Sequence, residues 1–374
     1  MRIKKVRILM GIPHLAAKGG PPTHLPYLVE YFRSHSGYTI KTFYYGSKNF
    51  GTVKGESETV FKKIIQTLIN LITYLYYIIV YRPDIVHLNS AFDFIALLRD
   101  VPFSLLSLVM RRNLIIKLHG SKYDLLMTKN RFKRLLVKFM FTGASCIGVL
   151  SDVERDEFIQ QYGFKDKIIV VKNIIPSKTL NAKNEYFDRK KYECYGLFVS
   201  RIDEKKGLAD LIMAVPEILK NKPSFKLVIA GDGPERENCE NLADNLGVSS
   251  HLNWLGYVES INILTLYSQS DVFVFPTHYP EGMPMALVDA LIVGVPIVTT
   301  RVRFASSYLK DMVNCLFVDK ARPKQIANAV IHVLNDTDLQ NSMSKMNPKL
   351  LYGFSKKQVG GEFCAIYMKM LSEK

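Results

Sequence analysis

Two carboxylates lie within one segment, residues 275–300, which reads FPTHYPEGMPMALVDALIVGVPIVTT. Glu281 stands just before a predicted helix that Pro284 begins and Gly294 ends. Asp289 lies inside this helix, on the face that continues from its start, and it interrupts an apolar run although aspartate is a poor helix former. The free N–H groups at a helix start bind phosphate. The segment therefore suits a polyol linked to a diphosphate; the alternative is that Glu281 caps the helix and Asp289 faces water.

Two cations follow a predicted buried strand in residues 197–212, LFVSRIDEKKGLADLI. The strand ends at Ser200, Arg201 and Lys206 lie in the next loop, and Gly207 opens a helix. Cations placed after the carboxyl end of a strand lie where doubly wound sheets bind phosphate. These side chains are candidate phosphate ligands, and an ordinary charged loop is the alternative.

Four further positions lie at or near strand ends. Gly231 belongs to the strand–turn–helix segment LVIAGDGPERE, and Tyr257 follows the strand in HLNWLGYV. Gly20 lies between the first strand and the first helix, and His119 ends the strand in LIIKLHG. Ligands of doubly wound sheets bind at such ends. Backbone freedom at the glycines and a purely structural histidine are the alternatives.

The sequence has no P-loop lysine motif, no H-E-x-x-H and no G-x-S-x-G. Its one D-x-D stands at Asp336–Asp338, between two predicted helices and far from the segments above. We predict that this pair caps a helix and that the chain has no metal site.

Short β-rich apolar runs alternate with helical patterns along the whole chain, which predicts βαβ units and parallel sheets. Two sets of six strands predict two doubly wound, Rossmann-like domains of the α/β class, with a ligand between them. We place these domains at residues 1–178 and 179–374, with the last helix as a candidate to pack back on the first domain. The predicted strands are Val6–Ile12, Thr39–Tyr44, Ile85–Leu88, Leu114–Leu118, Cys146–Leu150, Ile168–Val171, Gly196–Ser200, Lys226–Ala230, Leu252–Leu255, Val272–Phe275, Pro296–Thr299 and Leu316–Val318.

The segment Ile64–Tyr81 is uncharged and as long as a short membrane span. Gln66, Asn70, Thr73 and Tyr77 recur along it at helical spacing, so one face is polar. This pattern favours a mostly buried helix of a soluble domain.

The positive charge is confined to one half of the chain. Residues 1–190 contain 30 basic and 14 acidic side chains, whereas residues 191–374 contain 20 of each. A basic surface attracts nucleic acid, anionic lipid or anionic substrates. The five widely spaced cysteines form no metal or disulfide pattern and favour a reducing compartment.

Part of this charge lies on a predicted amphipathic helix in residues 129–141, KNRFKRLLVKFMF. Such a helix can lie at an anionic lipid interface, and the alternative is a core helix whose cations face water. Its apolar stripe consists of Phe132, Leu135, Leu136, Phe139 and Met140. Its cations are Arg131, Lys133, Arg134 and Lys138.

Together these motifs resemble the retaining glycosyltransferases of family 4, also called glycosyl transferases group 1, which have the GT-B fold. The match covers most of the chain. Its most specific pieces are SRIDEKKG at 200–207, GDGPERE at 231–237, WLGYV at 254–258 and EGMPMALVDA at 281–290, with RPDIVHLN at 82–89 and KLHG at 117–120 in the first half.

The resemblance implies catalytic roles for four residues. Arg201 and Lys206 would hold the diphosphate of a nucleotide diphosphate-sugar donor, Glu281 would hydrogen-bond the transferred sugar, and His119 would lie near the sugar and the acceptor. Asp289 stands where the family has a glutamate that binds ribose. The donor-binding positions that it implies are Gly20, Gly231, Tyr257, Gly282, Met283, Pro284, Met285 and Asp289.

The resemblance further implies a metal-independent, hexosyltransferase-like reaction with retention of configuration. Fixed cations and helix-end N–H groups would stabilise the charge that develops on the leaving diphosphate. The chain departs from the family at 303–318, which lacks the usual acidic residue, and at 171–176, which keeps only the Asn of an N-G turn.

We therefore expect a glycosyltransferase of polysaccharide biosynthesis that is cytoplasmic and peripheral on the inner face of the cytoplasmic membrane. Its acceptor would be lipid-linked or a growing polysaccharide. The alternatives are a nucleotide-sugar 2-epimerase and a catalytically dead sugar-nucleotide-binding protein. A nucleic-acid binder is disfavoured because no recognition motif is present.

Overall fold

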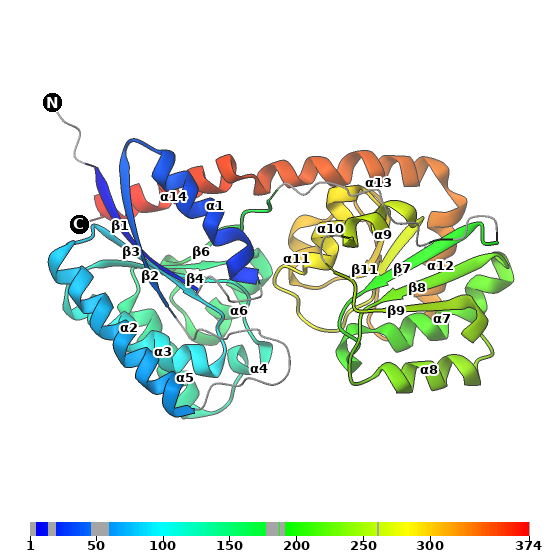
Figure 1. The fold of residues 1–374 in the computed structure, drawn as a ribbon, viewed down its shortest axis with the longest axis horizontal. Helices are drawn as coiled ribbons and strands as arrows, with labels where there is room; N and C mark the ends of the chain where they lie inside the picture. Colours follow the sequence, from blue (N-terminus) through cyan, green and yellow to red (C-terminus); the bar gives the residue numbers. More distant parts are fainter. Residues whose placement is uncertain are drawn as a thin grey trace. The chain divides into compact units, whose positions relative to one another are not determined.

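The computed structural model in Figure 1 describes residues 5–13, 20–45, 60–176, 187, 191–259 and 262–373. The chain divides into two compact units, one made of residues 1–176 with 353–374 and the other of residues 177–352. Each unit contains one parallel sheet of six strands between helices. The predicted domain boundary, between residues 178 and 179, lies outside the described residues.

The sheet of the first unit has the strand order β2-β1-β3-β4-β5-β6. Successive side chains on a strand point to opposite faces, so Ile8 packs on one side of the sheet and Leu9 on the other. Helices α1 and α14 cover the first side, and α2, α3, α5 and α6 cover the second (Figure 1). The strands are β1 Val6–Ile12, β2 Tyr38–Tyr44, β3 Ile85–Ser90, β4 Asn113–Leu118, β5 Cys146–Val149 and β6 Ile168–Val170, and the helices are α1 Gly20–Ser34, α2 Val60–Val80, α3 Phe94–Val109, α4 Tyr123–Leu126, α5 Arg131–Gly143, α6 Asp152–Tyr162 and α14 Lys356–Ser372.

The last helix completes the core of the first unit. Phe363 and Tyr367 of α14 are buried against Phe32 of α1 and against the first sheet. The Tyr367 hydroxyl also lies 2.6 Å from Nδ1 of His87 on β3. The first unit is therefore built from both ends of the chain.

The sheet of the second unit has the order β12-β11-β10-β7-β8-β9. Its main core lies where α7, α8 and α12 pack on one face of the sheet. The strands are β7 Cys194–Val199, β8 Phe225–Ala230, β9 Leu252–Gly256, β10 Val272–Phe275, β11 Ile297–Thr300 and β12 Leu316–Val318, and the helices are α7 Leu208–Asn221, α8 Arg236–Asn245, α9 Ile263–Gln269, α10 Met285–Val293, α11 Arg303–Tyr308, α12 Pro323–Asn335 and α13 Thr337–Leu350. All twelve strands predicted from the sequence are present.

The prediction that Ile64–Tyr81 is mostly buried is wrong. Asn70, Tyr74 and Ile78 of α2 face inward, and the Tyr74 hydroxyl hydrogen-bonds Ser107 of α3. Ile72, Leu75 and Tyr76, which lie between these residues, are exposed. Among the described helices, none combines the length and the apolar character that crossing a bilayer requires.

Candidate functional site

Lys206 and Glu281 meet at the carboxyl ends of two neighbouring strands, β7 and β10. The Lys206 ammonium donates to Glu281 Oε1 at 2.5 Å, and the two side chains are 20% and 12% exposed. The Thr277 hydroxyl lies 3.4 Å from the same carboxylate oxygen. The pair is thus largely shielded from solvent, and the charge-assisted hydrogen bond holds both side chains in place.

The loop around Glu281 is held by backbone hydrogen bonds. The Glu281 N–H donates to the Tyr279 carbonyl at 2.8 Å, and the Glu281 carbonyl accepts from the Phe304 N–H at 3.1 Å. Helix α10 begins four residues later, at Met285, after Pro284 as N-cap. No side chain caps this helix, so Glu281 is not its cap. The first N–H groups of α10 are therefore available to an anion.

Two glycines let the loops of the second unit approach closely. Gly207 has φ +76°, and a Cβ there would come within 2.1 Å of the Pro276 carbonyl oxygen. Gly231 has φ +147°, and a Cβ there would come within 1.8 Å of the Ser200 carbonyl oxygen. Any larger residue would push apart the loops that follow β7, β8 and β10, so both glycines set the position of Lys206.

The other predicted donor residues of the second unit differ in their exposure to solvent. Arg201 is exposed at the end of β7, and no hydrogen bond or ion pair joins its guanidinium to the described residues. Gly282 and Met283 are half-buried in the loop before α10, whereas Tyr257 is 82% exposed beyond β9. Asp289 is 6% exposed, so it does not point to water.

Asp289 lies near a buried phenol. Burial raises the pKa of Tyr267 well above its ordinary value, and the negative charge of Asp289 raises it further. The Asp289 carboxylate is therefore within electrostatic range of Tyr267 on α9. The structure thus gives Asp289 a packed environment inside the second unit.

In the first unit, His119 lies in a network at the end of β4. Asn89 donates from Nδ2 to the Gly11 carbonyl at 2.7 Å, which directs its Oδ1 to His119 Nε2 at 2.6 Å. His119 Nδ1 lies 2.9 Å from His24 Nε2 and 3.0 Å from Asn173 Oδ1. His24, Asn89, His119 and Asn173 line a small pocket of the first unit.

Burial lowers the pKa of the bases around this pocket. Desolvation lowers the pKa of His119 well below its ordinary value, and the neighbouring His24 lowers it further. Desolvation also lowers the pKa of His87 to about 3 and that of Lys117 to about 7. The Lys117 ammonium donates to the Val149 carbonyl at 3.2 Å. His119 is thus a neutral hydrogen-bonding group at physiological pH.

Three residues near these sites were missed or passed over in the sequence. His24 lies 95 residues from His119 and carries no motif. Asn173 is the Asn of an N-G turn whose Gly is absent from this sequence, and this gave no sign that it lies beside His119. Arg303, 2% exposed at the start of α11, stands beside the Phe304 amide that binds the Glu281 backbone. Its position after β11 was the available signal, because cations after strand ends are candidate phosphate ligands.

The structure also shows the surroundings of two more positions singled out in the sequence, Asp336 and Gly20. The Asp336 side chain accepts from the Leu339 N–H at 2.8 Å and caps α13, as predicted. Gly20 is the first residue of α1, and residues 14–19 before it lie outside the described residues.

Comparison with known proteins assigns both halves of the chain. The family model described as "Glycosyltransferase Family 4" matches residues 19–178, and that described as "Glycosyl transferases group 1" matches residues 181–350. An uncharacterized glycosyltransferase of Methanocaldococcus jannaschii is 37% identical over 140 residues, 37% of this chain. The alpha-monoglucosyldiacylglycerol synthase of Acholeplasma laidlawii is 24% identical over 203 residues, 54% of this chain. These alignments span only 35% and 50% of the two relatives.

Solved structures share the fold over nearly the whole chain. A glycosyltransferase from Rickettsia africae has a TM-score of 0.74 at 18% identity, covering 99% of this chain and 100% of that one. Anabaena HepE in complex with UDP has a TM-score of 0.70 at 16% identity, covering 98% and 100%. With both halves matched and both sheets in place, the chain belongs to the group 1, family 4 glycosyltransferases and has the GT-B fold.

Proposed function

We propose that this chain is a retaining glycosyltransferase that moves a sugar from a nucleotide diphosphate-sugar to a lipid-linked acceptor or a growing polysaccharide. The observation that carries the proposal is the shielded Lys206–Glu281 pair beside the uncapped start of α10. A cation and a row of N–H groups suit the diphosphate, and a carboxylate suits sugar hydroxyls. HepE, which shares the fold, was solved with UDP.

The charges of the second unit fit the chemistry of the leaving group. Cleavage of the sugar–diphosphate bond develops negative charge on the diphosphate and positive character on the sugar. Lys206, Arg201 and the first amides of α10 would stabilise the former. Glu281 would position the sugar and hold the Lys206 ammonium. With these fixed charges in place we expect no metal requirement.

The first unit supplies the acceptor side of the proposal. His119 is neutral and its orientation is fixed by Asn89, so it would serve as a hydrogen-bonding group for the sugar or the acceptor. The Acholeplasma relative is named as the synthase of a glycolipid, alpha-monoglucosyldiacylglycerol. We extend this to a lipid-linked acceptor and to a peripheral position on the inner face of the cytoplasmic membrane, with the cations of α5 meeting anionic headgroups.

A donor screen tests the proposal. Thermal shift and hydrolysis would be measured across UDP-, GDP-, ADP- and dTDP-sugars, followed by transfer to extracted lipid-linked glycans. We expect one donor to stabilise the protein and to yield a new glycosidic product. An isomerised nucleotide-sugar without an acceptor product would instead show the 2-epimerase, and binding without turnover would show a catalytically dead protein.

A further inference from the structure

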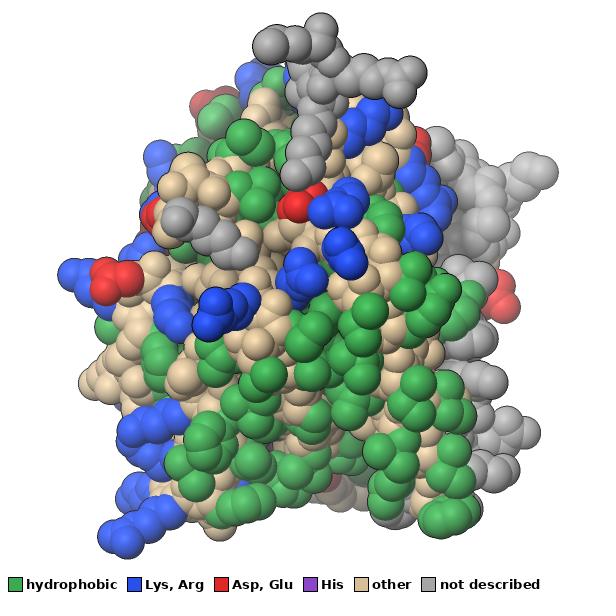
Figure 2. All heavy atoms as spheres, turned by 90° about the vertical axis from the view of Figure 1, so that its left-hand side faces the viewer, with side chains coloured by type: hydrophobic (Ala, Val, Ile, Leu, Met, Phe, Trp, Pro, Cys, Tyr) green, Lys and Arg blue, Asp and Glu red, His purple; other side chains and the backbone are tan. Residues whose placement is uncertain are grey.

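Helix α2 presents its apolar side chains to the outside of the first unit. Phe61 is 71% exposed, Ile72 69% and Val80 60%. Figure 2 shows hydrophobic side chains gathered over the lower part of this side of the molecule, with Lys and Arg side chains above them. The exposed apolar residues of α2 are Phe61, Ile64, Ile65, Leu68, Ile69, Ile72, Leu75, Tyr76, Ile79 and Val80.

The exposed apolar surface continues onto α3 and α5, which lie beside α2 on the same face of the sheet (Figure 1). Helix α3 exposes Ile95, Leu98 and Val109, and α5 exposes Phe132 and Leu135. Soluble proteins seldom leave a large contiguous apolar patch uncovered, and such patches mark interaction sites. We call the exposed apolar residues of these three helices the α2 face.

The α2 face lacks exposed carboxylates. Helices α2, α3 and α5 contain one acidic residue, Asp100, which is buried and paired with Arg99 at 2.7 Å. Helix α5 contributes four cations, Arg131, Lys133, Arg134 and Lys138. An apolar surface that is edged by cations and is free of exposed anions complements an anionic lipid headgroup layer.

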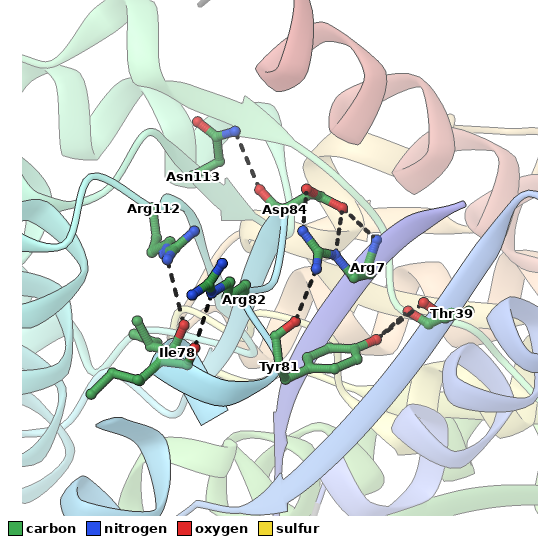
Figure 3. Close-up of polar contacts among 9 residues, drawn as sticks. Arg7, Thr39, Ile78, Tyr81, Arg82, Asp84, Arg112 and Asn113 are labelled. Atoms are coloured by element: carbon green, nitrogen blue, oxygen red, sulfur yellow. Dashed lines mark hydrogen bonds and ion pairs between the residues drawn. The ribbon is translucent and has the colours of Figure 1, made fainter. Parts of the chain in front are cut away.

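More cations gather where α2 ends. Arg112 donates to the Ile78 carbonyl and Arg82 to the Ile79 carbonyl, each at 3.4 Å (Figure 3). These contacts hold the arginines beside the last turn of α2, where cations also favour the helix dipole. Arg82 and the neighbouring Arg111 are exposed, within the same end of the unit as the exposed Val80.

We propose that the α2 face inserts into an anionic bilayer, with α2 in the plane of the interface, its isoleucines at the acyl boundary and Arg82 and Arg111 at the lipid phosphates. This inference rests on the proposed function, because it supposes a membrane-bound acceptor. It goes further by assigning the apolar anchor to α2, in addition to the electrostatic contact of α5. A second copy of the chain fits less well, because each copy would bring cations and no exposed carboxylate of these helices to the contact.

Insertion can be read from tryptophan fluorescence. The native chain has one tryptophan, Trp254 in the second unit, and it serves as background. Ile72→Trp would be mixed with vesicles of brominated phosphatidylcholine and phosphatidylglycerol. We expect the added emission to shift to the blue and to be quenched. Met213→Trp, at an exposed position of α7, is the matched control and should remain unquenched. Equal emission of Ile72→Trp with and without vesicles would overturn the inference.

Binding is tested by a triple substitution of Ile65, Ile69 and Ile72 to Gln, with vesicle sedimentation at low and high salt. Wild type should keep part of its binding at high salt. The triple variant should bind on the order of a thousandfold more weakly, since each of the three buried aliphatic side chains contributes about a decade. The matched control replaces three exposed residues of the second unit, Met213, Leu246 and Met346, by Gln and should bind like wild type. Circular dichroism would verify folding.

The outcomes separate this inference from the proposed function. If the triple variant sediments like wild type, the α2 inference fails and the glycosyltransferase proposal stands. If vesicles bind through α2 but no nucleotide-sugar is hydrolysed or transferred, the proposed function fails and the inference stands. A concentration-dependent dimer that the triple substitution dissolves, with no vesicle binding by wild type, would overturn the inference in favour of a second copy.

Discussion

Lys206 and Glu281 are joined at 2.5 Å although 75 residues of sequence separate them. Parallel pairing of β7 with β10 brings their carboxyl ends together. The loops that follow the two strands then bring Lys206 and Glu281 into contact. Each residue comes from a different segment singled out in the sequence. The ion pair is therefore the point at which two independent motifs become one site.

The first prediction concerns the cations at this site. Lys206→Ala and Arg201→Ala should each lower turnover by roughly 10²–10³-fold, the usual cost of losing one transition-state charge partner. Lys205→Ala changes an exposed neighbour and is the control. Initial rates with the donor from the screen give the measurement. Wild-type rates in both variants would remove these cations from the site.

The second prediction concerns Asp289. If its carboxylate serves the nucleotide, Asp289→Ala should weaken nucleotide binding by about 1.5–3 kcal/mol, the range for a hydrogen bond to a charged group. Asp289→Glu should bind as well as wild type or better. Isothermal calorimetry measures the affinity. Unchanged affinity together with a lower melting temperature would assign Asp289 to packing beside Tyr267 only.

The third prediction follows from the depressed pKa of His119. Burial holds the pKa of His119 well below its ordinary value of 6.5. The imidazole therefore gains a proton only on the acid side of the physiological range. His119→Gln should lower turnover and leave the shape of the pH–rate profile unchanged between about pH 6 and 8. A wild-type acidic limb near pH 6.5 that disappears in His119→Gln would contradict a neutral role.

The fourth prediction concerns the buried Lys117. Its pKa is about 7 in the folded chain and 10.5 ordinarily, so between these values the unfolded chain binds more protons. The free energy of unfolding should therefore rise with pH in this window through the Lys117 contribution. Lys117→Met should flatten that slope in urea titrations, whatever its effect on overall stability. An identical slope in both proteins would show that Lys117 is charged when folded.

The fifth prediction concerns α5. Arg131 and Lys138 are exposed, whereas Lys133 lies over the Phe94 ring and Arg134 donates to the Gln161 carbonyl. Replacing all four by Gln should weaken binding to anionic vesicles at low salt, because each cation near the headgroups contributes about 1 kcal/mol. The Arg131 and Lys138 pair should account for most of the loss. Sedimentation that is insensitive to both salt and these substitutions would exclude the electrostatic contact.

The strands could be predicted because each is a short buried run between turn residues, a local property. The predicted start of α10 and the cap at Asp336 depend on local signals as well. Spatial pairings such as His24 with His119 could not be predicted, since nothing in either segment refers to the other. The exposure of the apolar side of α2 was not predicted, because periodicity identifies two faces of a helix but does not say which of them turns inward.

The place of α14 sets an order of assembly during synthesis. A ribosome releases the strands of the first unit long before residues 356–372 exist, and the second unit is complete before them. Until residues 356–372 have left the ribosome, the side of the first sheet that Phe363 and Tyr367 cover remains open. Domains generally fold in the order in which they emerge. Here the first unit to begin is the last to finish, so a nascent chain that stalls before α14 exposes apolar surface to chaperones.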